Sequence, residues 1–126
     1  MTRTICFAAL GLSLTSCLDG GDRVCRTTTI LPATAVTGPK TVAVNQPAVY
    51  TIDYELGACG SFINIAEQVL GSSRLVGVNM QYDGCNCPST VTQERATYTF
   101  QPTQPGTYYL QFAASNGNIK DTLVVK

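Results

Sequence analysis

Cysteine is the residue type in this sequence whose spacing points most directly to chemistry. Four cysteines follow residue 24, and they could form two disulfides or bind a soft metal ion through their thiolates: Cys25, Cys59, Cys85 and Cys87. Cys85 and Cys87 are separated by one residue, so a bond between them would close a strained ring. The disulfide interpretation therefore joins one of this pair to Cys25 and the other to Cys59, and which joins which is left open.

The other reactive side chains do not form a catalytic apparatus. The sequence has no histidine, so the commonest general base and metal ligand is absent. Asp53 and Glu55 share one face of a predicted strand, which favours a solvated surface over two acids across a cleft. Asp83-Gly84 lacks the acidic spacing of a calcium loop. We therefore predict no enzymatic activity, no resident metal and no cofactor.

Length and charge exclude further classes of protein. The chain has 126 residues, of which 44% are hydrophobic, a size and share expected for one globular domain. Lys and Arg number 8 and Asp and Glu number 8, so the formal net charge is zero. The basic residues are also scattered along the chain. Nucleic acid is therefore not a predicted partner.

The first sixteen residues have the pattern of an export signal. Arg3 supplies a short positive region, and the apolar stretch from Ile5 to Leu14 is too short to cross a bilayer core of about 30 Å as a helix. The stretch ends in Leu14-Thr15-Ser16-Cys17. These four residues resemble the lipobox of bacterial lipoproteins, in which an apolar residue and two small residues precede a cysteine.

The lipobox resemblance implies the location of the protein. Residues 1–16 would be a signal peptide removed before Cys17, which would carry a diacylglycerol on its thiol and usually an acyl chain on its amine. Several acyl chains make a stable membrane anchor. Residues 17–24 would then be the lipidated cysteine and a flexible tether. Leu18, where an aspartate would retain the protein, favours the outer membrane if the host has one. Export to an oxidising compartment favours disulfides over a thiolate metal site.

The remaining chain, residues 25–126, has the two-residue period of β-strands. Residues 62–70 fit a strand or a short helix by pattern, and the spacing of the neighbouring strands favours a strand. Pro32 interrupts residues 27–36 and suits an edge strand or a switch between sheets. Together these patterns predict a sandwich of seven antiparallel strands. Apolar and polar residues alternate clearly in five stretches: 48–56, 74–83, 95–100, 107–113 and 119–126.

Residues 101–112 resemble the entry to strand F of immunoglobulin-like domains. In that family a glycine precedes a tyrosine by two positions and an inward residue follows by two, as Gly106, Tyr108 and Leu110 do here. The resemblance implies that Tyr108 is a tyrosine corner, with its hydroxyl bonded back to the preceding loop. Leu110 stands where antibody domains have a cysteine, and the chain has no tryptophan. The resemblance is therefore to the bacterial immunoglobulin-like superfamily at large.

Strand direction predicts where the cysteines lie. Cys25 begins the first strand, Cys59 follows the second, and the other two follow the fourth, so alternating strands bring all four to one pole. That pole lies eight positions beyond Cys17 and should face the membrane. The opposite pole should carry residues 45–47, 71–73 and 101–106 and be more accessible on intact cells.

Two functional classes remain from the sequence. The first is a non-catalytic binding module of the cell envelope that recognises a protein or glycan through distal loops or a sheet edge. The second is a structural or accessory component of an envelope assembly, and an inhibitor of hydrolases is a weaker third. An exposed apolar patch on a loop end or an edge strand would favour the binding module.

Overall fold

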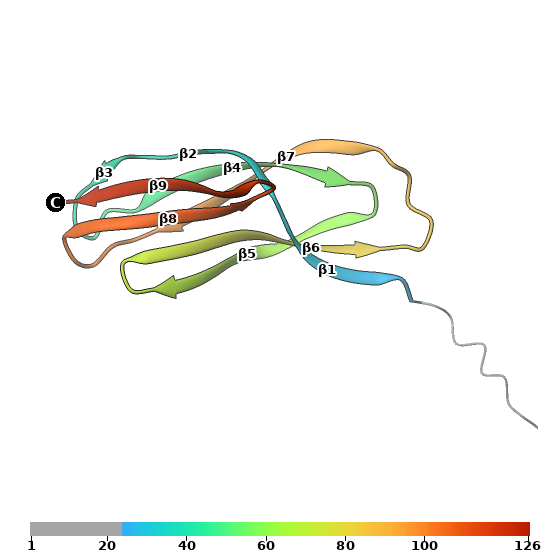
Figure 1. Ribbon diagram of the computed structural model, residues 1–126, viewed down its shortest axis with the longest axis horizontal. Coiled ribbons are helices and arrows are strands. Elements are labelled where there is room, and N and C mark those ends of the chain that lie inside the picture. Colours follow the sequence, from blue (N-terminus) through green and yellow to red (C-terminus); the bar gives the residue numbers. More distant parts are fainter. Residues whose placement is uncertain (1–23) are drawn as a thin grey trace, which may run out of the picture.

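The computed structural model describes residues 24–126, and this part of the chain is all-β (Figure 1). The predicted signal peptide, Cys17 and the predicted tether up to residue 23 lie outside the described residues. The strands are β1 (Arg26–Leu31), β2 (Ala33–Thr37), β3 (Thr41–Val42), β4 (Ala48–Gly57), β5 (Gly60–Leu70), β6 (Ser73–Asp83), β7 (Val91–Phe100), β8 (Gly106–Ala114) and β9 (Gly117–Val125). No membrane-spanning helix is found within residues 24–126.

The prediction of seven antiparallel strands is wrong in number and in pairing, because residues 24–126 form nine strands in one mixed sheet. Pro32 has no backbone N–H and divides the first predicted strand in two. β1 then pairs with β6, whereas β2 pairs with β4, so Pro32 marks a switch between partners. β3 is a short addition that pairs with β9. β6 and β8 pair in parallel, because β7 between them in sequence pairs elsewhere, with β4.

The sheet curls so that two groups of strands face each other across the core. β2, β4 and β7 form one group, and β5, β6, β8 and β9 form the other (Figure 1). The ring of Phe112 on β8 lies 5.5 Å from that of Tyr50 on β4 and 6.1 Å from that of Tyr98 on β7. Aromatic contacts at these distances add to the stabilisation from burial. The predicted alternation is confirmed, since the residues predicted to face inward on these strands are buried or half-buried.

Residues 62–70 belong to β5, so the prediction of a strand rather than a helix is confirmed. β5 is joined to β4 by the turn at Ala58 and Cys59, and to β6 by the turn at Gly71 and Ser72. Gly71 has φ 62°, a backbone conformation that glycine adopts at little cost. Within residues 24–126, β5 pairs with β6 alone, which makes β5 an edge strand.

The molecule has two distinct ends. The cysteine end comprises the start of β1, the β4–β5 turn and the β6–β7 loop (Figure 1). The distal end comprises β3, the β5–β6 turn, the β7–β8 loop and the C-terminus (Figure 1). The β8–β9 turn points toward the cysteine end but stops short of it.

Candidate functional site

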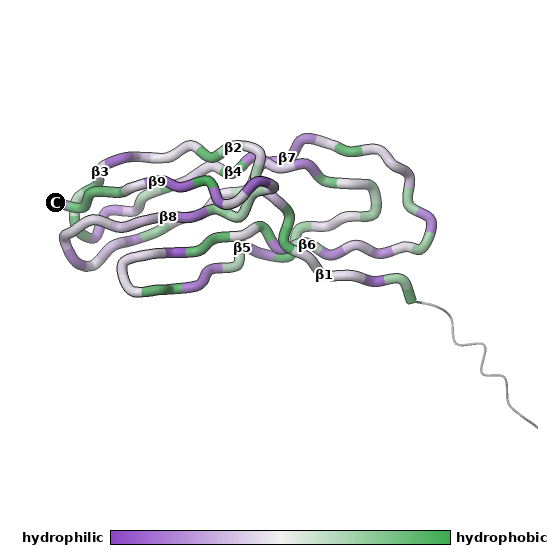
Figure 2. Tube along the Cα trace, in the orientation of Figure 1, coloured by the Kyte–Doolittle hydropathy of each residue, from purple (hydrophilic) through white to green (hydrophobic). Residues whose placement is uncertain are grey.

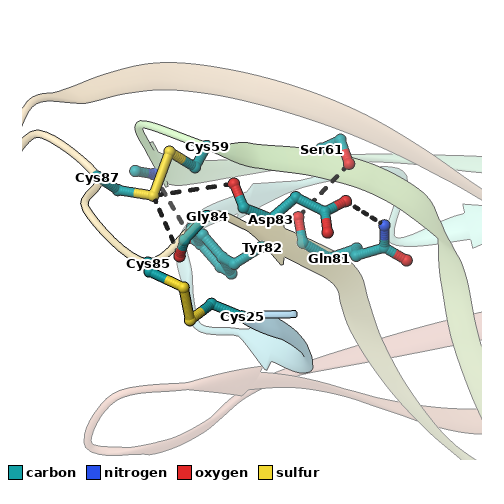
Figure 3. Close-up of a disulfide and its surroundings, with 10 residues drawn as sticks. Cys25, Cys59, Ser61, Gln81, Tyr82, Asp83, Gly84, Cys85 and Cys87 are labelled. Atoms are coloured by element: carbon teal, nitrogen blue, oxygen red, sulfur yellow. Dashed lines mark hydrogen bonds between the residues drawn. A yellow bond between two sulfur atoms is a disulfide. The ribbon is translucent and has the colours of Figure 1, made fainter. Parts of the chain in front are cut away.

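The cysteine end holds both disulfides (Figure 3). Cys25 pairs with Cys85 and Cys59 pairs with Cys87, with Cα atoms 5.0 Å and 5.9 Å apart. One of the two adjacent cysteines thus joins each of the two distant ones, as the spacing predicted, and the structure supplies the pairing that the sequence left open. Within residues 24–126, no group of three or more His, Cys, Asp or Glu side chains is placed to hold a metal ion.

Gly84 allows the two disulfides to lie next to each other. Its φ is 136°, and an added Cβ would lie 2.9 Å from Sγ of Cys87 and 3.3 Å from Sγ of Cys59. The Gly84 N–H also donates to the carbonyl oxygen of Cys25 at 2.8 Å. A side chain at this position would therefore strain the backbone and press on the second disulfide.

Tyr108 lies at the distal end. Its hydroxyl donates to the carbonyl oxygen of Gln104 at 3.0 Å, the backward bond that the resemblance to strand F implied. Its ring centroid is 5.0 Å from that of Phe100, and the Arg74 guanidinium lies 5.8 Å from the Tyr108 ring. These contacts tie the β7–β8 loop to the end of the core, which is a structural role.

The carboxylates considered in the sequence do not form a catalytic pair. Asp53 and Glu55 point away from the core, where Asp53 accepts from Arg95 at 2.6 Å and Glu55 accepts from Gln93 at 2.8 Å. Asp83 lies at the cysteine end, and its hydrogen bond from Arg26 lowers the pKa of its carboxyl group. Each of these groups thus has a local partner on an exposed surface.

The surface with the clearest binding character is β5. Three of its apolar side chains are about half exposed, namely Phe62 at 49%, Val69 at 58% and Leu70 at 54%, and Ile63 is exposed at 42%. The hydrophobic colouring at the end of β5 next to the β5–β6 turn is visible in Figure 2. An uncovered apolar edge strand is a site at which soluble proteins associate, so a monomer seldom keeps one without a partner.

A groove lies on the side of β5 that faces β7. It has a volume of about 380 Å³ and is lined by Tyr54, Phe62, Arg95, Ala96 and Thr97. Tyr54 and Ala96 belong to the buried core, and Phe62 forms the exposed wall. We refer to it as the β5–β7 groove.

A second depression lies on the outer side of β5. It also has a volume of about 380 Å³, and small residues on three strands line it: Ala66, Gly77 and Ala113. Ile30 and Leu75 complete its apolar lining. A Cβ on Gly77 would lie 2.7 Å from Cγ2 of Ile30, so a side chain at this position would displace the Ile30 side chain of β1. We refer to it as the outer hollow.

A side-chain hydrogen bond links β5 to β7 outside the lining of the groove. The hydroxyl of Tyr98 on β7 donates to the carboxylate of Glu67 on β5. Burial, with the Glu67 carboxylate as a further cause, raises the pKa of Tyr98 well above its usual range. The hydroxyl therefore stays protonated and a donor at neutral pH, and it links the two edges through side chains.

Sequence reasoning did not single out β5 as a site. The available signal was the loss of alternation in FINIAEQVL, where the neighbours Phe62-Ile63 and Val69-Leu70 place apolar side chains on both faces of one strand. Such a strand exposes apolar surface if it lies at an edge. Its edge position depends on pairing with β6, which the local pattern does not encode.

Comparisons of the chain with protein-family models, curated protein sequences and solved structures found no match.

Proposed function

We propose that this protein is a lipid-anchored lipoprotein of the cell envelope whose immunoglobulin-like β-domain is a non-catalytic binding module. The observation that carries the proposal is the exposed apolar edge strand β5, flanked by the β5–β7 groove and the outer hollow. This is the feature that favours a binding module over a purely structural component. The partner is an envelope protein that lies against β5.

Site-specific photocrosslinking in intact cells tests the binding function. A photoreactive amino acid at Ile63 on β5 should give one discrete crosslinked product with an envelope protein. The same amino acid at the exposed Lys120 on β9 is the matched control and should give none. Equal products from both positions, or none from either, would contradict a binding module that uses β5.

The anchor is tested separately, because Cys17 lies outside the described residues. Cys17→Ser should abolish incorporation of a labelled fatty acid and leave the β-domain folded. Incorporation equal to that of the unchanged protein would rule out lipidation at Cys17. In the anchored protein, a tag at Ser72 should be labelled on intact cells more readily than a tag at Asn116, since the cysteine end is tethered.

A further inference from the structure

The strand β7 has a free edge that is more regular than that of β5. Within residues 24–126, β7 pairs with β4 alone, and its register runs without a shift from Val91 opposite Gly57 to Phe100 opposite Ala48. The register of β5 shifts between Phe62 and Asn64. Because a bulge blunts an edge against pairing with another strand, β7 is the better template for an added strand.

The β5–β7 groove lies beside this free edge. Arg95, Ala96 and Thr97 on β7 contribute to its lining, and Phe62 stands opposite them. The first five residues of β7, 91–95, are exposed. When a peptide adds to a sheet edge, its alternate side chains enter pockets next to that edge. The groove is a pocket of this kind for one apolar side chain.

Acidic side chains outnumber basic ones on the three strands around the β5–β7 groove. Arg95 is the single cation on β4, β5 and β7, and it already pairs with Asp53 at 2.6 Å. The same three strands carry four carboxylates: Asp53, Glu55, Glu67 and Glu94. An approaching strand with basic side chains would therefore be attracted to this side of the molecule.

Two of these carboxylates, which are not part of the groove lining, are related by sequence position or by a hydrogen bond to β7 residues next to Ala96. Glu94 lies two positions before Ala96 on the same face of β7, and Tyr98 lies two positions after it. Tyr98 holds the Glu67 carboxylate by its hydroxyl. Along the core-facing side of β7, Glu94 thus precedes the pocket residue Ala96, and Tyr98 follows it with the Glu67 carboxylate of β5 at its hydroxyl.

We infer that the β7 edge accepts an extended peptide segment of a partner protein, in which an apolar residue is flanked at two-residue spacing by lysine or arginine. Backbone hydrogen bonds to β7 hold the segment, its apolar side chain enters the β5–β7 groove, and its basic side chains lie near Glu94 and Glu67. This inference rests on the proposed binding function and names the chemistry of the partner.

The experiment uses a fluorescent synthetic peptide, TKTVTKT, and the folded protein with intact disulfides. Binding is measured by fluorescence anisotropy at low salt, and amide hydrogen exchange locates the contact. We expect saturable binding with new protection within residues 91–97. Two control peptides, TETVTET and TKTSTKT, should bind more weakly because they reverse the charge or remove the apolar side chain.

Protein variants separate the site from general charge attraction. Combining Glu67→Gln with Glu94→Gln should weaken binding roughly fivefold, the effect expected for two exposed ion pairs. The glutamine at position 67 can still accept from Tyr98, so the fold should be kept. Asp83→Asn removes an exposed carboxylate at the cysteine end and should leave binding unchanged.

Three outcomes would overturn the inference: no saturable binding of TKTVTKT, equal binding of TETVTET, or protection on strands other than β7. Concentration-dependent protection of residues 91–97 without peptide would also overturn it, because a second copy of the chain would then be the occupant. If crosslinking at Ile63 captures an envelope protein while TKTVTKT fails, the partner class is wrong and the binding function stands. If crosslinking at Ile63 fails as well, the proposed partner class and the proposed binding function are both wrong.

Discussion

Backbone hydrogen bonds between segments occur at both ends of this domain, but among residues 24–126 the disulfides lie at the cysteine end alone. At the cysteine end the β6–β7 loop and the first half of β7 are exposed, and two disulfides connect the loop to Cys25, which precedes β1, and to the β4–β5 turn. At the distal end the chain is held by backbone hydrogen bonds, among them Asn45 N–H to the carbonyl of Pro102 at 2.8 Å and Val44 N–H to that of Lys126 at 3.1 Å. The covalent links therefore lie where side-chain packing contributes least.

This difference explains how β7 can be regular and still uncovered. Its second half is anchored in the core by Tyr98 and Phe100, whereas its first half follows the disulfide-bonded loop. A free edge held in this way keeps its shape with β4 as the neighbour on one side and no described strand on the other. Covalent support at one end and packing at the other thus leave an ordered edge available for a partner.

The largest expected effect is that of reducing the disulfides. They span 60 and 28 residues, and the chain-entropy model assigns each about 4 kcal/mol, comparable in sum with the stability of a small domain of about 5–15 kcal/mol. We expect reduction to unfold the domain or nearly so, as measured by calorimetry with and without reductant. An unchanged melting temperature would show that the cysteine end is held by packing after all.

Alkaline pH should act on the core near the distal end. Tyr50 is buried and donates to the carbonyl of Pro39 at 2.9 Å, and burial with the nearby Asp121 raises the pKa of Tyr50 to about 12. Because the folded state holds this proton more tightly than the unfolded chain, whose tyrosines titrate near about pH 10, the stabilisation is complete below that pH. This stabilisation should be lost as the pH rises from about 10 through the pKa of Tyr50 in the folded state.

Tyrosinate absorbance followed together with circular dichroism checks this expectation. Ionisation of the buried tyrosines should coincide with unfolding. Tyr109→Phe, which changes an exposed tyrosine, is the control and should leave the unfolding transition where it is. Full ionisation of all six tyrosines in a folded domain would contradict the burial of Tyr50.

A glycine at each end allows a matched comparison. Gly84→Ala should cost about 3 kcal/mol, because the backbone is strained and the new Cβ meets both sulfurs of the second disulfide. Gly71→Ala at the distal end has open space around it and should cost about 1 kcal/mol, for the left-handed backbone alone. Urea denaturation gives both values, and equal losses would show that crowding by the sulfurs contributes nothing.

Removing the hydrogen bond of the Tyr108 hydroxyl should have an effect as small as that of Gly71→Ala. Tyr108→Phe keeps the ring against Phe100 and removes the hydrogen bond to Gln104, so we expect a loss of about 1 kcal/mol. Hydrogen exchange should rise in residues 101–106 and stay unchanged at the cysteine end. A loss of protection at both ends would mean that the two ends unfold together.

Much of the fold could be predicted because short stretches of the sequence determine it. Alternation identified the inward faces of β4, β6, β7, β8 and β9, since each of these strands has one face in the core and one in solvent. The spacing of Cys85 and Cys87 excluded a bond between them. Pro32 marked the place where the first strand changes partner, because a residue without an N–H interrupts a ladder.

The sequence by itself determined the β class, the inward faces and the meeting of the four cysteines, because strand period, turn residues and cysteine spacing are local properties. The tertiary structure alone decided the disulfide pairing, the parallel neighbours β6 and β8, and the free edges of β5 and β7. Those features depend on which strands pair over long separations in the chain. The candidate site is of this second kind: Phe62 and Ala96 line one groove only because the sheet curls to bring β5 opposite β7.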